Sequence, residues 1–430
     1  MTSLKNTQSW GALRDVSRKA GCATHGEWLY QAIFCRWLSG DLCISSHRAG
    51  EMTTMRRIGY VITLLALSVC PALADTVLPG IVREPLLLPI TLPNGQQVKL
   101  EGLVIRPDRS GHFPLVVLVH GSPRSEPGKF LEAYQQVSPA VLAGPALNFA
   151  QRGFAAVSIL RRGFGRSGGP YAEFIGDPCD NTDYVRVARI SAEDVLGAVA
   201  ALRDEPWADA SRVVMLGHST GGLAVMAAGA VNPPGVVGIL NFAGGRGSFQ
   251  PDQVCSPDRL VEAFDAFGRT ARIPSLWMFA ENDHYLGLPL AHRLFDAYAD
   301  AGAPAQLQML PPYGADGHLL LTAAPVDLWW QPVERFLNGL HLPTSVVVEL
   351  PPLAALPAPT PLNPACTNFF NQYNSARTDT KAFAVGPEGH CSSSVTARTV
   401  EEAKEEAMSR CTKAWKECTL YAVGQQLVHG

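Results

Sequence analysis

The sequence predicts an α/β fold with a mostly parallel sheet and helices on both faces, followed by a small α+β C-terminal module. Buried-strand patterns alternate with helical stretches five times, and a Pro-rich segment then precedes a short cysteine-containing tail. Such alternation requires right-handed crossovers, which place helices on both faces of one sheet. The 430 residues, 47% apolar and 17% charged, suffice for about two to three globular domains.

The first expected strands form a hairpin, and the later ones are continuous apolar runs. Residues 85–107 are typical of paired strands around Asn94-Gly95, a tight-turn dipeptide. Runs typical of strands buried on both faces lie at 115–119, 154–160, 213–216, 236–242, 276–280 and 307–310. Helical patterns separate them at 140–152, 191–203, 222–230, 290–301 and 326–340. Ser191 and Asp194 form a capping-box pattern, which predicts that the second helix begins there.

Two stretches interrupt this alternation and are expected to be irregular. Residues 170–187 and 244–273 each follow a strand at its carboxyl end, where open sheets place their binding crevice. Each contains one cysteine, Cys179 or Cys255. We therefore expect the two stretches to form a cap over the site, tied together by a disulfide.

The segment before the first strand is typical of an export signal. Arg56 and Arg57 precede an apolar run at 58–69, and Ala72 and Ala74 supply small residues before a cleavage point. The run of about 12 residues is shorter than the ~20 that span a bilayer. We interpret 55–74 as a signal peptide, which predicts a periplasmic or secreted protein.

The position of this signal implies that the natural chain starts later. Residues 1–54 are interpreted as a non-native upstream extension, with Met52 or Met55 as a conventional start. The alternative is a genuine amphipathic extension with the apolar run as a membrane anchor. The mature chain then divides into an α/β domain (75–343), a Pro-rich linker (344–365) and a small disulfide-bearing module (366–430).

An even number of cysteines remains after the signal. They are Cys179, Cys255, Cys366, Cys391, Cys411 and Cys418. In an exported chain this predicts disulfides, one in the larger domain and two in the tail. The alternative is that they are buried free thiols. Because the cysteines form no CxxC pair and lie near no His cluster, we expect no metal site.

One motif has the form of a nucleophile elbow. Gly217-His218-Ser219-Thr220-Gly221 follows the strand at 213–216 and precedes a helix rich in small residues. A sharp turn there would raise the Ser219 hydroxyl above the sheet, and the glycines would let neighbouring backbone approach. The alternative is a plain serine in a Gly-rich turn.

A serine nucleophile needs a base, and the base needs an orienting acid. Asp283 follows the strand at 276–280 and His318 follows the strand at 307–310, so the order Ser219, Asp283, His318 is the one expected for such an elbow. The competitors are His218, His284 and His292 for the base and Glu281 and Asp316 for the acid.

The oxyanion of an acyl-transfer intermediate needs backbone donors. The amide of Thr220, directly after Ser219, is one candidate. The loop after the strand at 115–119 supplies the second, from Ser122 or Gly121, because Pro123 has no N–H.

Five motifs together resemble a known superfamily. HGSP, RRGFGRSGG, GHSTG, ENDHY and DGH, in this order, are similar to α/β-hydrolases of the dienelactone-hydrolase-like and prolyl-oligopeptidase-like branch. The resemblance implies the α/β-hydrolase fold and a serine hydrolase. Two features depart from it: dienelactone hydrolases use Cys where this chain has Ser219, and the stretch before the first hairpin is far too short for a propeller. The tail resembles a small cysteine-containing module of exported bacterial proteins.

These inferences predict an exported serine hydrolase that cleaves carboxylic esters through an acyl-enzyme on Ser219, with no cofactor. The alternatives are a small-peptide peptidase, an acyltransferase, or a non-catalytic envelope-binding protein on a hydrolase scaffold. The expected partner is a small-molecule ester or short peptide, with a contact to envelope or cell-wall material through the tail. The formal charge of −3, without blocks of one sign, excludes a nucleic-acid footprint.

Overall fold

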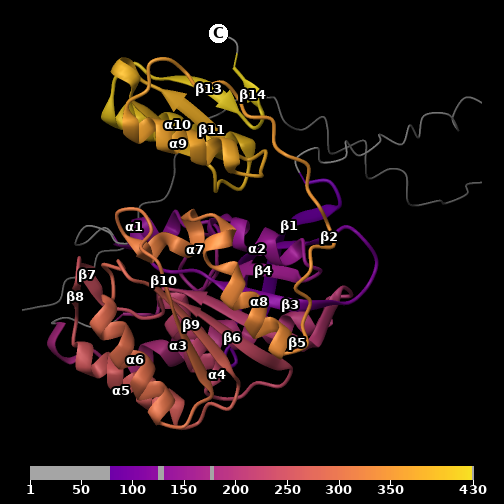
Figure 1. Ribbon diagram of the computed structural model, residues 1–430, viewed down its shortest axis with the longest axis vertical. Helices are drawn as coiled ribbons and strands as arrows, with labels where there is room; N and C mark the ends of the chain where they lie inside the picture. The colour runs from indigo at the N-terminus through magenta and orange to yellow at the C-terminus, as the bar shows by residue number, and fades with distance from the viewer. Residues whose placement is uncertain (1–77, 124–129, 175–178, 429–430) are drawn as a thin grey trace, which may run out of the picture. The chain divides into compact units, whose positions relative to one another are not determined.

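The computed structural model describes residues 78–123, 130–174 and 179–428. The proposed signal peptide at 55–74 and the upstream extension lie outside these residues. The centre of the larger domain is an eight-stranded sheet with the order β1-β2-β4-β3-β5-β6-β9-β10 (Figure 1). Its strands are β1 (Ile81–Thr91), β2 (Gln97–Pro107), β3 (Phe113–Val119), β4 (Ala155–Ile159), β5 (Ala208–His218), β6 (Val236–Phe242), β9 (Ser275–Ala280) and β10 (Ala305–Leu310).

The pairing of these strands confirms the mostly parallel sheet. β1 pairs with β2, and β2 with β4, in antiparallel fashion, whereas every pair from β4 to β10 is parallel. The hairpin between β1 and β2 turns at Asn94-Gly95, where Gly95 has a φ of 82°. The carboxyl ends of β3, β5, β9 and β10 therefore meet at one edge of the sheet.

Helices cover both faces of the sheet, as predicted. They are α1 (Phe130–Gln135), α2 (Ala143–Ala150), α3 (Tyr184–Ala201), α4 (Thr220–Gly229), α5 (Pro257–Gly268), α6 (Leu288–Asp300), α7 (Leu320–Ala323) and α8 (Trp330–Gly339). One apolar core joins the sheet to α3, α4, α5 and α6, and the other joins it to α2, α7 and α8 (Figure 1). Along β3, Leu115 and Val117 belong to the first core and Val116 and Leu118 to the second. This alternation explains why the strand is a continuous apolar run.

The prediction that a helix begins at Ser191 is wrong. α3 begins at Tyr184, and Asp183 caps it by accepting a hydrogen bond from the Arg186 amide at 2.9 Å. The Ser191 hydroxyl donates to the Val187 carbonyl at 3.1 Å within the helix. The two polar side chains of the predicted capping box therefore have other partners, because Asp194 accepts from the Arg162 amide.

The stretch at 244–273 is also more regular than predicted. It contains two short paired strands, β7 (Ser248–Gln250) and β8 (Gln253–Val254), and the helix α5. Leu260, Phe264 and Phe267 of α5 are buried in the core shared with α3 and α6. Their i, i+4, i+7 spacing is that of an amphipathic helix, and Pro257 is tolerated in its first turn. This helix is part of the layer on one face of the sheet rather than an irregular cap.

The structure contains the three disulfides Cys179–Cys255, Cys366–Cys391 and Cys411–Cys418. The first joins residues 76 apart in sequence. A loop of that length stabilises the fold by about 4 kcal/mol if the disulfide acts through the entropy of the unfolded chain. The same region is fixed further by Tyr184, whose hydroxyl donates to the Cys255 carbonyl at 2.5 Å.

The tail forms a small α+β module after residues 343–363, which contain no helix or strand. Its elements are α9 (Pro364–Ser375), β11 (Ala382–Val385), β12 (Cys391–Ser394), α10 (Val400–Ala414), β13 (Thr419–Val423) and β14 (Gln426–Leu427). The strands make an antiparallel sheet with the order β12-β11-β13-β14. The Thr399 hydroxyl accepts from the Glu402 amide at 3.1 Å and caps the start of α10. Within the described ranges, no helix has both the length and the apolar character needed to cross a membrane.

Candidate active site

A cavity of about 230 Å³ opens at the edge where the parallel strands end. Ser219, His318, Gly121 and Ser122 line it together with Tyr285 and with both apolar and polar side chains. The structure thus brings together loops that follow β3, β5, β9 and β10. In the described part of the chain, no cluster of three or more His, Cys, Asp or Glu residues is arranged to hold a metal ion.

Ser219 occupies the tight turn between β5 and α4. Its backbone has a φ of 57° and a ψ of −121°, a conformation that costs a non-glycine residue about 1–3 kcal/mol. A Cβ on Gly221 would lie 2.1 Å from the Val119 carbonyl oxygen, and one on Gly217 would lie 2.2 Å from the Gly221 carbonyl oxygen. The glycines of the motif are therefore required by the close approach of neighbouring backbone.

His318 and Asp283 form a buried pair next to this turn. The distance from His318 Nδ1 to Asp283 Oδ2 is 2.9 Å, and the two side chains are 3% and 1% exposed. The other carboxylate oxygen of Asp283 accepts from the amides of Tyr285 and Leu286 at 2.7 and 3.1 Å. Burial alone would raise the pKa of Asp283, but the hydrogen bonds from His318 and these amides outweigh it, so the pKa lies below its usual value. The carboxylate therefore stays ionised and holds Nδ1 of His318 as a donor.

The second ring nitrogen of His318 then carries a free lone pair. Nε2 is buried and has no hydrogen-bond partner among the described residues. The Tyr285 ring stacks on the imidazole with a centroid distance of 3.9 Å and an angle of 5°, which fixes its orientation. The Ser219 hydroxyl lines the same cavity without bonding to Nε2 in this structure. In ligand-free sites a nucleophile and its base are often not hydrogen-bonded, and the bond forms when substrate binds.

The competing histidines lie elsewhere or have other partners. His284 contacts Asp252 at 3.0 Å near the surface, and His292 is exposed on α6. His218 is buried and donates from Nε2 to the His318 carbonyl at 2.8 Å. Burial, together with the nearby His318, lowers the pKa of His218 to about 4. A neutral His218 therefore supports the backbone of His318 at the wall of the cavity.

The competing acids also have other surroundings. Glu281 is exposed. Asp316 begins the short 3-10 helix at Gly317–Leu319 and accepts from the amides of His284 and His318 at 3.1 and 3.0 Å. Asp283 is thus the carboxylate that contacts the His318 ring.

The buried His218 predicts a pH-dependent stability. Its pKa is about 4 in the folded protein, against an ordinary histidine value of 6.5, so the unfolded chain binds the proton first as pH falls. The stability that neutral His218 contributes is full above pH 6.5 and is lost as pH falls towards 4, by at most about 3 kcal/mol. His218→Gln keeps a donor near Nε2 without titrating. We expect thermal denaturation to show a smaller fall in Tm between pH 7 and 4.5 for this variant than for the wild type, and parallel curves would contradict this.

The two predicted oxyanion elements lie on either side of Ser219. Thr220 is the first residue of α4, so its amide is one of the helical N–H groups without an intrahelical acceptor. On the other side, a Cβ on Gly121 would lie 2.9 Å from the Ser219 Cβ. The backbone of Gly121, which precedes Ser122, therefore lies directly against the nucleophile candidate.

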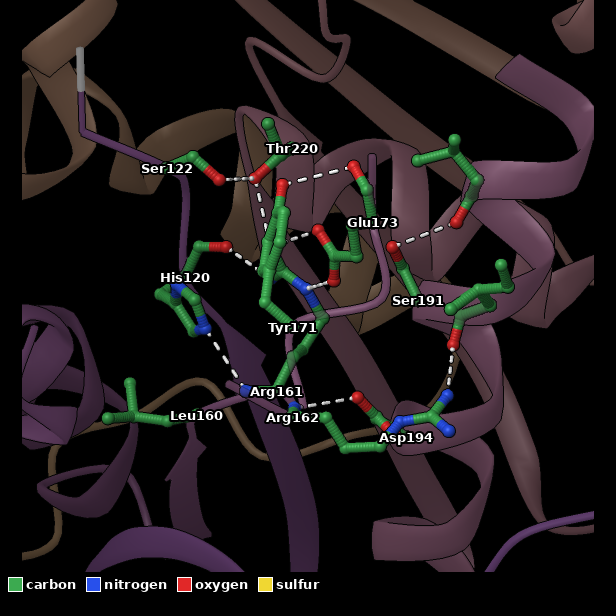
Figure 2. Close-up of polar contacts among 12 residues, drawn as sticks. His120, Ser122, Leu160, Arg161, Arg162, Tyr171, Glu173, Ser191, Asp194 and Thr220 are labelled. Carbon is green, nitrogen blue, oxygen red and sulfur yellow. Dashed lines mark hydrogen bonds and ion pairs between the residues drawn. The ribbon is translucent and has the colours of Figure 1, made fainter. Parts of the chain in front are cut away.

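A buried ionic cluster that the sequence did not predict supports these loops. Arg161, two residues after the end of β4, donates from Nε to Glu173 Oε1 at 2.5 Å (Figure 2). Arg246 donates to the other oxygen of Glu173 at 2.8 Å. All three side chains are at most 7% exposed. Burial would raise the pKa of Glu173, but Arg161 and Arg246 lower it to about 2. One signal in the sequence could have indicated this cluster. Arg161 directly follows the expected buried strand at 154–160, and a buried guanidinium needs a carboxylate partner.

Arg161 connects this cluster to the site through His120. Its Nη1 donates to the His120 carbonyl at 2.6 Å, and its backbone amide donates to His120 Nε2 at 3.1 Å (Figure 2). His120 Nδ1 is therefore the protonated nitrogen and donates to the Gly121 carbonyl at 2.7 Å. Burial and the neighbouring Arg161 lower the pKa of His120 to about 3. A neutral His120 with a single tautomer fixes the loop that carries Gly121 and Ser122.

Comparison with known proteins identifies the family. Similar solved structures include an esterase from Pyrococcus furiosus (15% identity, 60% of this chain and 91% of that chain, TM-score 0.41). Others are an acylaminoacyl peptidase from Pyrococcus horikoshii (17%, 60% and 41%, TM-score 0.43) and a dienelactone hydrolase-like promiscuous phosphotriesterase from metagenomic libraries (17%, 54% and 82%, TM-score 0.37). No curated protein matches. A family model described as the alpha/beta hydrolase family matches residues 116–400, which is more than half of the sequence, and the chain belongs to this family.

Proposed function

We propose that this protein is an exported serine hydrolase that cleaves carboxylic esters through an acyl-enzyme on Ser219. One observation carries the proposal: an ionised Asp283 holds Nδ1 of His318, and the free Nε2 of His318 is buried beside the cavity that Ser219 lines. A nitrogen lone pair kept out of water next to a serine hydroxyl is the arrangement that activates a serine nucleophile.

The proposed reaction has two half-reactions. Nε2 of His318 takes the Ser219 proton while Oγ attacks the ester carbonyl carbon. The oxyanion that forms is stabilised by the Thr220 amide and by an amide of Gly121 or Ser122. His318 then protonates the leaving alcohol, which departs and leaves the acyl group on Ser219. Water, deprotonated by His318, attacks this ester, and the carboxylic acid leaves as Ser219 recovers its proton.

The cavity favours esters of short acids. Its volume of about 230 Å³ is below the range of roughly 300–1,000 Å³ typical of sites for drug-sized ligands. Val141, Leu142 and Leu319 give it apolar walls, which suit a short acyl chain better than a charged group.

The cysteines support export. All six cysteines of the proposed mature chain are paired in disulfides. Disulfides persist in oxidising compartments such as the periplasm and the extracellular space. The paired cysteines therefore support export, and the signal-like segment at 55–74 supports it independently.

The test combines active-site labelling with a substrate panel. The purified full chain is treated with a fluorophosphonate probe and assayed with p-nitrophenyl esters of increasing acyl length, short peptide anilides, and an ester plus an added alcohol. We expect labelling, hydrolysis that is fastest for the shortest acyl chains, and little transfer to the alcohol. Faster cleavage of the anilides would indicate a peptidase, and transfer products would indicate an acyltransferase. Neither labelling nor turnover would contradict the proposal and favour a binding protein.

A further inference from the structure

A line of hydrogen bonds runs from the buried ionic cluster to the cavity. Glu173 holds Arg161, Nη2 of Arg161 donates to Thr220 Oγ1 at 3.0 Å, and Thr220 Oγ1 lies 3.0 Å from Ser122 Oγ (Figure 2). Figure 2 shows the Ser122 and Thr220 hydroxyls pointing toward one another, Ser122 from the loop after β3 and Thr220 from the start of α4. The line ends at Ser122, which lines the cavity together with Ser219 and His318.

The direction of donation along this line follows from the chemistry of the groups. A guanidinium can only donate, so Thr220 Oγ1 accepts from Arg161. Accepting from a cation makes a hydroxyl a stronger donor and its remaining lone pair a weaker acceptor. The Thr220 proton is therefore directed to Ser122 Oγ, and the Ser122 proton is left to point away from Thr220.

The Ser122 hydroxyl is placed to donate to a ligand. Its neighbour Gly121 lies against the Ser219 Cβ, and Ser122 itself is partly exposed to the cavity. We propose that this hydroxyl is a third, side-chain donor to the oxyanion that forms at Ser219, polarised by Arg161 through Thr220. The inference rests on the proposed function and extends it, because the oxyanion site otherwise consists of backbone amides.

The charge of the cluster favours this role. Two guanidinium groups, Arg161 and Arg246, share the single carboxylate of Glu173, so these three side chains carry one net positive charge. The adjacent Arg162 belongs to a second group, with Asp194 and Glu193 at 2.6 and 2.8 Å, and because one guanidinium there faces two carboxylates this group supplies no positive charge of its own. The positive charge nearest Thr220 is therefore the guanidinium of Arg161. A fixed positive charge in a buried site stabilises the negative charge that develops on the substrate oxygen. Arg161 is thus a positioning residue and Ser122 the group that contacts the substrate.

The experiment compares three variants on the same p-nitrophenyl ester. Ser122→Ala removes the donor, Thr220→Val removes the link to Arg161 while keeping the backbone amide, and Thr220→Ser restores a hydroxyl. We expect Ser122→Ala to lower kcat roughly 10–100-fold with little change in KM. This loss in kcat is equal to, or somewhat smaller than, the loss that follows removal of a single oxyanion donor in other enzymes. Thr220→Val should lower kcat less, Thr220→Ser should recover it, and the double variant Ser122→Ala/Thr220→Val should be no slower than Ser122→Ala alone.

The controls separate this inference from the proposed function. Ser211→Ala changes an exposed serine on β5 and should leave kcat unchanged. The melting temperature and the rate of inactivation by the fluorophosphonate probe are measured for each variant, because the phosphonyl oxygen occupies the oxyanion site. If the wild type is active and Ser122→Ala has the same kcat and inactivation rate, the inference is overturned and the proposed function stands. Multiplicative losses in the double variant would overturn the link through Thr220, and absence of wild-type turnover would overturn both the inference and the proposed function.

Discussion

Replacing Ser219 with alanine is expected to abolish ester hydrolysis, with kcat lower by a factor on the order of 10⁵ or more. The variant has no atom that can form the acyl-enzyme. Folding should be almost unaffected, because alanine is no larger than serine and adopts the same backbone conformation at the same cost. Initial rates with a short acyl p-nitrophenyl ester and thermal denaturation of the same preparation measure the two effects.

The exposed Ser211→Ala variant serves as the control for this prediction and should match the wild type in both measurements. Hydrolysis retained by Ser219→Ala would show that another residue, or none, is the nucleophile. Loss of activity accompanied by a large fall in Tm would attribute the effect to misfolding instead of chemistry.

Replacing Asp283 with asparagine is expected to lower kcat by roughly 10³–10⁴-fold. If the amide oxygen keeps the hydrogen bonds from Tyr285 and Leu286, the NH₂ group faces His318 Nδ1. His318 then has to accept at Nδ1 and carry its proton on Nε2, so Nε2 is no longer a base. Steady-state kinetics near neutral pH measure the effect, and KM should change little.

Asp316→Asn provides a matched control for the choice of acid. Among the residues that the structure describes, Asp316 Oδ1 accepts from the backbone amides of His284 and His318, and an asparagine oxygen can accept the same bonds. We expect kcat within a few-fold of the wild type. A large loss in Asp316→Asn with little loss in Asp283→Asn would assign the orienting role to Asp316.

Much of the fold could be predicted because local pattern and tertiary role coincide in the strands. β3 and the second half of β5, from residue 213 on, are buried on both faces, so their apolar runs identify them directly. The elbow could be predicted because the packing around Gly217 and Gly221 leaves no room for a side chain. Asp283 and His318 could be chosen because each follows the carboxyl end of a parallel strand.

Other features depend on contacts that no local pattern reveals. Glu173 lies 12 residues from Arg161 and 73 from Arg246, and no periodicity links the three. Ser191 and Asp194 satisfied a capping pattern although Asp183 supplies the actual cap of α3, because tertiary partners compete for the same polar side chains.

The tail shows how a linker composition can hide a helix. α9 begins at Pro364, inside the predicted Pro-rich linker, and Asn363 caps it by accepting from the Cys366 amide at 2.9 Å. Cys366, Phe370 and Tyr373 are buried at a helical spacing. This periodicity was present in the sequence, but the preceding prolines favoured an extended segment instead.

The most direct test of the central claim is to trap the acyl-enzyme. The protein is quenched with acid during turnover of a short acyl p-nitrophenyl ester, and the acyl mass is located by peptide mass spectrometry. The account predicts a single adduct on Ser219 that is absent from Ser219→Ala and increases in the wild type during the initial burst of p-nitrophenol. An adduct on a different residue, or rapid turnover without any covalent adduct, would contradict it.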